Sequence, residues 1–196
     1  MVLLLSTNWF IASIIDGIIY GIYGLMFAIF SLLSFWMANY LYTKKIDDEI
    51  NGEEYVAVVL TNKSFNDKIF IYFCGVMFLL MYLKKNKISY KVMKEFDIEK
   101  FKGFIYDPNC YGLYIIGHGI RHGLRISNNE ILYYCSFKDA PKKEFVQQLH
   151  CNQYGGESLA DIIASNKEKS FAPDGFRSVY ANLSYFIHLY RLPLKK

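Results

Sequence analysis

A histidine and a cysteine follow two apolar segments that are typical of buried β-strands. His118 follows the run LYIIG, and Cys151 ends the run FVQQLHC. A thiol needs a general base or a cationic neighbour to ionise near neutral pH, and an imidazole supplies either. If the two segments are neighbouring parallel strands, their carboxyl ends lie at one edge of the sheet. The pattern therefore predicts that His118 and Cys151 form a nucleophilic pair.

The residues after His118 suggest further roles at the same site. Gly119 has no side chain, so its backbone N–H can point into a cleft and, with the N–H of Cys151, hold the oxyanion of an attacked carbonyl. Arg121 and Arg125 are candidates for binding an acidic side chain of a substrate, although loop arginines are more commonly solvated.

Other histidines offer competing interpretations. His122 also precedes a glycine, but His118 is the preferred base because it directly follows the strand. His150 precedes Cys151, and neighbouring side chains of an extended strand point to opposite faces, so we expect His150 to pack in the interior. A metal site built from these three histidines and Cys151 is disfavoured, because His-x-x-x-His in a loop lacks the helical register that such ligand pairs use. No metal or cofactor is expected.

Strands and helices alternate after residue 54, which predicts an α/β fold with a mostly parallel sheet. We expect sheet strands at residues 55–60, 89–93, 111–116 and 145–149, and a hairpin at 123–127 and 130–136. Helices are expected at 66–87, 98–105, 157–164 and 177–192.

The helix expected at 66–87 has an unusual core, since residues 69–83 are apolar on every face. These fifteen residues would reach only about 22 Å, short of a hydrocarbon core of about 30 Å. We favour a helix buried between the sheet and a partner, and a second membrane crossing is the alternative.

The paired segments resemble the caspase-like cysteine peptidases, which include caspases, gingipains, CHAT-domain proteases and the autoprotease domains of bacterial toxins. The resemblance covers residues 55–164 and consists of a strand followed by His-Gly and a later strand ending in Cys, here LYIIGHG and FVQQLHC. The segment CNQYGGESLADIIA is similar to the toxin and CHAT branches. The resemblance implies a three-layer α/β/α sandwich in which His118 is the base, Cys151 the nucleophile and Gly119 an oxyanion donor. Many caspases have a small residue where this chain has His150, so we expect a different substrate groove.

Residues 1–42 carry one charged side chain, Asp16, and residues 17–42 exceed the roughly 20 apolar residues that a membrane-spanning helix needs. Either a single long helix or a helical hairpin turning near residues 16–17 is compatible with this length. Aromatic residues and then two lysines follow, which predicts a cytoplasmic end (Trp36, Tyr40, Tyr42, Lys44, Lys45). A signal peptide is disfavoured, because the apolar run is too long and no basic residue precedes it.

These observations divide the chain into a transmembrane anchor (1–45), an acidic linker (46–54) and a caspase-like domain (55–196). The net charge of +4 does not indicate a nucleic-acid partner. Four scattered cysteines argue against a disulfide framework and fit a reducing compartment (Cys74, Cys110, Cys135, Cys151).

The sequence thus predicts a membrane protein with a cytoplasmic cysteine endopeptidase domain that cleaves proteins or peptides. Analogy with the family suggests a role in regulated stress or defence responses. The expected partners are the lipid bilayer, a protein or peptide substrate and, through the apolar helices, further copies of the chain. The alternative is a non-catalytic oligomerising effector in which residues 69–83 insert into the bilayer and the His/Cys pair is incidental.

Overall fold

The computed structural model describes residues 2–61, 64–127, 130–150, 155–172, 174 and 178–193, with side chains from Asp16 onward except that of Ser127. It divides into two compact units, Met1–Ala38 and Asn39–Lys196. The second unit therefore begins within the predicted anchor, before residue 45.

The N-terminal segment is one continuous helix, α1 (Val2–Lys45). The expected alternative of a hairpin turning near residues 16–17 is therefore wrong, and the single long helix is observed. Its part Asp16–Lys45 is long and apolar enough to cross a membrane. The helix stays unbroken because no proline interrupts it and its three glycines, at 17, 21 and 24, are tolerated in an otherwise apolar run.

The second unit is an α/β structure built on a parallel sheet, as the sequence predicts. The strands are β1 (Tyr55–Leu60), β2 (Tyr90–Met93), β3 (Cys110–Gly117) and β7 (Phe145–His150), in the spatial order β2-β1-β3-β7. Every pairing in this sheet is parallel. All six residues of β1 are buried, because the sheet is covered on both faces.

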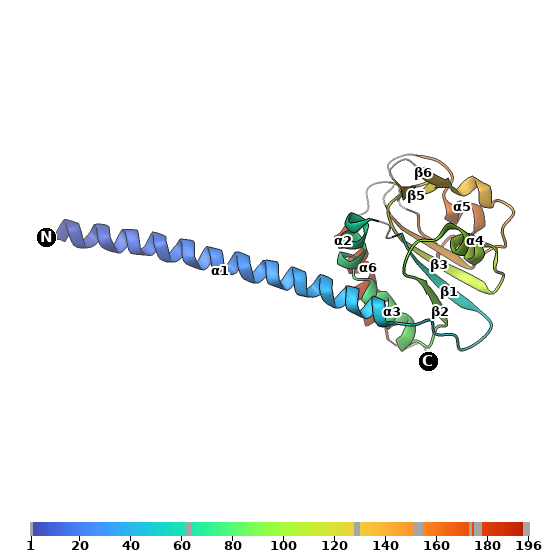
Figure 1. The fold of residues 1–196 in the computed structure, drawn as a ribbon, viewed down its shortest axis with the longest axis horizontal. Helices are drawn as coiled ribbons and strands as arrows, with labels where there is room; N and C mark the ends of the chain where they lie inside the picture. Colours follow the sequence, from blue (N-terminus) through green and yellow to red (C-terminus); the bar gives the residue numbers. More distant parts are fainter. Residues whose placement is uncertain are drawn as a thin grey trace. The chain divides into compact units, whose positions relative to one another are not determined.

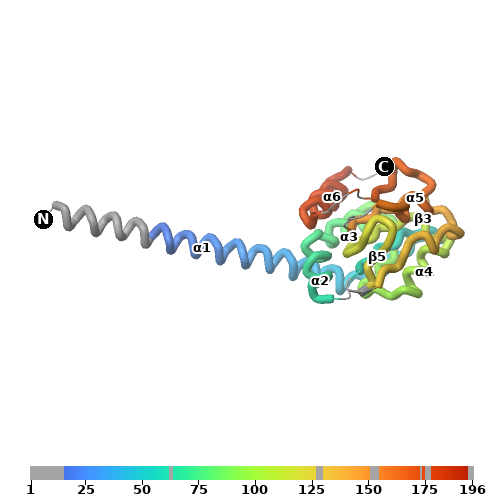
Figure 2. The backbone as a smooth tube through the Cα atoms, turned by 90° about the horizontal axis from the view of Figure 1, so that it is seen from above, coloured from blue at the N-terminus to red at the C-terminus, as the bar shows by residue number. Residues whose placement is uncertain are grey.

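Helices lie on both faces of this sheet, as Figures 1 and 2 show. One face carries α2 (Phe65–Phe73), α3 (Val76–Lys85) and α6 (Val179–Arg191). The other carries α4 (Ile98–Tyr106) and α5 (Leu159–Ile163), which enclose an apolar core with Phe101, Phe104 and Ile163. The layers are held together mainly by burial of these apolar side chains.

A small antiparallel sheet follows β3. It consists of β4 (Gly119–Ile120), β5 (Gly123–Ser127) and β6 (Glu130–Tyr133), in that order. The hairpin strand expected to continue to residue 136 ends at Tyr133, because the chain turns into a 3₁₀ helix, η1 (Tyr134–Phe137). This turn directs the buried side chains of Tyr134 and Phe137 inward.

The single helix expected at residues 66–87 is instead two helices, α2 and α3, bent by 53°. Gly75 lies at the break with φ +75°, a left-handed conformation that glycine adopts at little cost. Taken as one bent pair, the two helices are apolar enough to form a broken membrane span. However, Ile71, Leu79 and Leu80 are fully buried within the second unit, which favours the buried-helix interpretation.

Both edges of the parallel sheet are paired with other segments of the chain. Glu49 exchanges two backbone hydrogen bonds with Tyr90 of β2, at 2.9 and 2.6 Å. The predicted linker is therefore bound to the sheet rather than simply solvated. At the opposite edge, Phe171 accepts a hydrogen bond from the Gln148 N–H of β7 and donates one to Val146, and Ala164 pairs with Lys143 just before that strand.

Two glycine substitutions test why α2 and α3 separate. In Gly75→Ala the new methyl group would lie 2.5 Å from Cδ1 of Leu183 in a left-handed backbone, so we expect a loss of about 1–3 kcal/mol in the free energy of unfolding. In Gly103→Ala, within α4, the methyl group meets nothing within 4 Å, so a gain of about 0.5–1 kcal/mol is expected. Guanidinium unfolding in detergent, followed by circular dichroism, measures both. Equal effects of the two variants would contradict this explanation.

Candidate active site

The candidate site lies where β3 and β7 end. These neighbouring parallel strands are paired up to Gly117 and His150. His118 is the residue after the last pair on β3, and Cys151 is the residue after it on β7. Cys151 itself lies outside the described residues. The predicted adjacency of the two strands is thus confirmed, and the meeting of the two side chains stays a prediction.

His118 is held by the end of β1 and by α2. Its backbone N–H donates to Oγ1 of Thr61 at 3.1 Å, and its ring packs against that of Phe70 with centroids 4.8 Å apart. Its Nε2 lies 3.5 Å from Oδ1 of Asp67, and its side chain remains 35% exposed. The imidazole is therefore fixed in place while still open to solvent, as a general base must be.

The glycine before His118 is required by close packing. Gly117 has φ +148°, and a Cβ there would lie 1.6 Å from Oγ1 of Thr61. Since Thr61 also accepts the N–H of His118, the chain must pass very close to this hydroxyl. Gly117 is therefore a structural residue that allows His118 to be placed.

The N–H of Gly119 points away from β5. Gly119 lies opposite Leu124, and the neighbouring His118 carbonyl accepts the Arg125 N–H at 3.2 Å. This pattern makes Gly119–Leu124 a non-hydrogen-bonded pair, whose backbone groups face outward from the ladder. A Cβ at Gly119 would lie 2.8 Å from Nδ1 of His150 and 2.9 Å from the Gly123 carbonyl. The glycine is thus needed for packing, and its N–H is directed away from the hairpin.

A buried polar network lies beneath the strand ends. His150 is fully buried and its Nε2 is 2.9 Å from the Tyr134 hydroxyl. Burial raises the pKa of Tyr134, so its hydroxyl stays protonated in this hydrogen bond with His150. Gln148 accepts the N–H of Ala160 at 3.1 Å and donates to the Arg121 carbonyl at 3.2 Å. His150 therefore packs in the interior, as expected from its position.

His122, the competing base, is engaged elsewhere. Its Nδ1 lies 2.9 Å from the carbonyl of Gly155, and its ring stacks on that of Tyr133 with centroids 5.7 Å apart. A Cβ at Gly156, which has φ +126°, would lie 2.9 Å from the same nitrogen. His122 therefore holds the glycine turn that follows Cys151 in the sequence.

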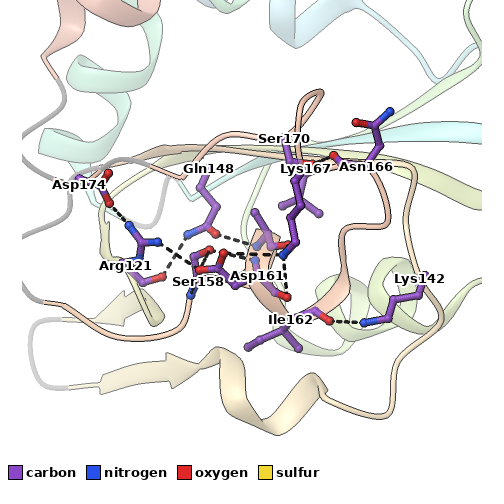
Figure 3. Close-up of polar contacts among 12 residues, drawn as sticks. Arg121, Lys142, Gln148, Ser158, Asp161, Ile162, Asn166, Lys167, Ser170 and Asp174 are labelled. Atoms are coloured by element: carbon purple, nitrogen blue, oxygen red, sulfur yellow. Dashed lines mark hydrogen bonds and ion pairs between the residues drawn. The ribbon is translucent and has the colours of Figure 1, made fainter.

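The two candidate substrate-binding arginines have different surroundings. Figure 3 shows the Arg121 guanidinium between two carboxylates: it forms an ion pair with Asp174 and lies 3.2 Å from Asp161 through Nη2. An acidic substrate group would have to compete with both. Arg125 is exposed on β5. Substrate binding by either arginine stays a prediction.

Asp161 connects Arg121 to the start of α5. Its carboxylate accepts the N–H and the hydroxyl of Ser158 at 3.0 and 2.6 Å, which completes a capping box. Burial alone would raise the pKa of Asp161, but the hydrogen bonds from Ser158 and the Arg121 charge outweigh it and hold that pKa below its usual value. Arg121 and Asp161 thus tie the loop after His118 to α5.

The disfavoured metal site has no counterpart among the described residues, where no three His, Cys, Asp or Glu side chains are grouped to hold an ion. Cys151, one of its four proposed ligands, lies outside those residues. In the described part of the site, His150 and His122 direct ring nitrogens at Tyr134 and at Gly155.

Asp67 and Phe70 are site residues that the sequence did not reveal. The pattern around Asp67 indicated only a helix start, and the residue is 51 positions from His118. The crossover through α2 brings them together, and no local signal in the sequence encodes that contact. The chain matches no family model, no curated protein and no solved structure.

The lowered pKa of Asp161 predicts an acid-sensitive contribution to stability. A carboxyl whose pKa is lower in the folded than in the unfolded state stabilises the fold above its unfolded pKa of about 3.9, and this contribution is lost as the pH falls through the folded pKa. We expect wild type to exceed Asp161→Asn in free energy of unfolding by a constant amount above about pH 5, and the difference to shrink below about pH 4.

Ser158→Ala is the companion variant, because it keeps the carboxylate and removes one hydrogen bond to it. The free energy of unfolding of Ser158→Ala should decrease less than that of wild type as the pH is lowered. Guanidinium unfolding at a series of pH values measures all three proteins. A difference between wild type and Asp161→Asn that stays constant down to about pH 2 would rule out the charge of Asp161 as its source.

Proposed function

We propose that this chain is a membrane-anchored cysteine endopeptidase with a caspase-like α/β domain, in which Cys151 is the nucleophile and His118 the base. The observation that carries the proposal is the parallel register of β3 and β7, which ends at Gly117 and His150. The two reactive residues therefore follow the last paired residues of adjacent strands. The all-parallel sheet with helices on both faces is compatible with the three-layer fold of the caspase-like peptidases.

The proposed reaction proceeds through an acyl-enzyme. His118 takes the thiol proton of Cys151, and the sulfur attacks the carbonyl carbon of the scissile peptide bond. The tetrahedral intermediate collapses, the C–N bond breaks, and His118 returns its proton to the departing amine. A water molecule, deprotonated by His118, then attacks the thioester. This step releases the carboxylic acid product and regenerates the Cys151 thiol.

The N–H of Gly119 is suited to stabilise the oxyanion of both tetrahedral intermediates. This N–H points away from β5, and Gly119 itself has no Cβ next to it. A backbone donor fixed before the reaction stabilises developing charge without reorganisation, which commonly accounts for several kcal/mol of catalysis. The N–H of Cys151 is proposed as the second donor.

The membrane anchor determines where this chemistry would occur. We propose that α1 spans the bilayer, with Lys44 and Lys45 at its cytoplasmic end. The domain would then lie in a reducing compartment, where thiols persist. We propose cleavage of protein or peptide substrates beside the membrane, and analogy with the family alone suggests that this cleavage is part of a regulated stress or defence response.

Thiol reactivity tests the proposed nucleophile. We expect iodoacetamide at pH 7 to alkylate Cys151 at least about tenfold faster than Cys135, because a neighbouring imidazole raises the thiolate fraction. Cys135 is the internal control, since it is exposed, whereas Cys74 and Cys110 are buried. His118→Ala should slow the alkylation of Cys151 and leave the alkylation rate of Cys135 unchanged. Peptide mapping by mass spectrometry measures each rate.

Equal rates for Cys151 and Cys135 in wild type would contradict the peptidase proposal. The remaining interpretation would then be the non-catalytic membrane effector, in which the pair is incidental.

Labelling of Cys135 also tests the proposed topology. In a Cys151→Ala variant, Cys135 is the exposed cysteine among the residues that the structure describes. A membrane-impermeant maleimide should label it only after the expressing cells are permeabilised. Labelling in intact cells would place the domain outside the cytoplasm.

A further inference from the structure

A carboxylate from α2 lies against the candidate base. Oδ1 of Asp67 is 3.5 Å from Nε2 of His118, and the Asp67 side chain is only 18% exposed. Phe70, one helical turn further on, packs against the same imidazole with ring centroids 4.8 Å apart. Residues three apart share a helix face. One face of α2 therefore contacts both the ring plane of His118 and one of its nitrogens.

The Asp67 carboxylate is itself fixed. Its Oδ2 accepts the Ser64 N–H at 2.8 Å, and the Asp67 N–H donates to the Ser64 hydroxyl at 3.1 Å. This capping box occupies one carboxylate oxygen, and the second faces His118. Because the backbone of His118 is held by Thr61, both partners are oriented before any substrate binds.

The contact selects one tautomer of the imidazole. A carboxylate is only an acceptor, so the ring nitrogen that faces it carries the hydrogen. A neutral imidazole has a single N–H, and therefore Nδ1 of His118 keeps its lone pair. Among the described residues, Nδ1 of His118 makes no hydrogen bond. This lone pair is the basic site of the neutral ring.

We infer that Asp67 is a positioning residue for His118: it holds Nε2–H, so that Nδ1 takes the proton from the nucleophile. This inference rests on the proposed function. When Nδ1 accepts the thiol proton of Cys151, the ring becomes a cation, and the adjacent carboxylate stabilises that cation. Asp67 acts through His118 and forms no bond with the substrate.

Asp67→Asn separates this role from helix capping. The amide oxygen can still accept the Ser64 N–H, but the group facing Nε2 becomes an NH₂ donor. The ring nitrogen opposite a donor must present its lone pair, so the hydrogen moves to Nδ1. The variant should therefore carry the reversed tautomer. Ser64→Ala is the matched control, because it removes the hydroxyl of the capping box and keeps the carboxylate.

The first measurement is the ¹⁵N spectrum of the imidazole of His118, taken on the full chain in detergent at about pH 8, where an unperturbed imidazole is neutral. A His118→Gln variant assigns the signals. We expect the Nε2–H tautomer in wild type and in Ser64→Ala, and the Nδ1–H tautomer in Asp67→Asn. Ser64→Ala should lower the melting temperature without changing the tautomer. If Asp67→Asn keeps the wild-type tautomer, the inference is overturned.

The second measurement is the alkylation rate of Cys151 with iodoacetamide. We expect Asp67→Asn to slow it at least about tenfold, and Ser64→Ala to leave it within about twofold of wild type. If Asp67→Asn and Ser64→Ala slow the alkylation of Cys151 equally, the effect comes from helix capping and the inference is overturned.

The tautomer reports the contact independently of any activity, so the two proposals can fail separately. If the tautomer reverses as expected but Cys151 of wild type reacts no faster than Cys135, the proposed function fails. The catalytic role of Asp67 then fails with it, whereas its hold on His118 is confirmed.

Discussion

The parallel pairing of β3 with β7 is the constraint on which the candidate site depends. Leu113 and Ile115 of β3 and Val146 of β7 are fully buried and belong to the core that α4 and α5 close. Burial of each such side chain contributes about 1.5–3 kcal/mol, so a shift in register would expose a large apolar area. Gly112 makes this register compatible with Phe145, because a Cβ there would lie 2.4 Å from its ring. Core packing thus determines which residues end the two strands together.

The buried polar groups beneath the strand ends add a second constraint. Apolar packing alone tolerates small shifts, whereas hydrogen bonds of buried groups depend strongly on distance and direction. His150, Gln148 and Tyr134 come from β7 and η1, and they connect to α5 and to the loop at Arg121. Loss of one partner would leave a buried polar atom unsatisfied, which costs about 1–3 kcal/mol. The network therefore holds the small sheet and α5 in a fixed relation to the end of β7.

The sequence predicted the parallel sheet well, because strands buried on both faces are read as continuous runs such as YVAVVL and LYIIG. It did not predict the break between α2 and α3. Gly75 lies in a run that is apolar on every side, and the close approach of Leu183 from α6, which would lie 2.5 Å from a Cβ at this position, is a tertiary contact. It also missed the pairing of Glu49 with β2, because an acidic segment with Asn-Gly is typical of a solvated loop. His118 and Gly119 could be proposed from their position after a strand, but Asp67 could not, since its contact is purely tertiary.

The covered edges of the parallel sheet limit how an extended polypeptide can be recognised. A free edge strand offers unpaired backbone groups to which another chain can add as a further strand, whether as a ligand or during aggregation. Here Glu49 occupies backbone groups on the β2 side, and Ala164 and Phe171 do so beside β7. Strand addition at either edge would first require the chain's own segment to leave. An extended polypeptide that bound this domain would therefore have to bind elsewhere than at these edges, and self-association through the sheet is disfavoured.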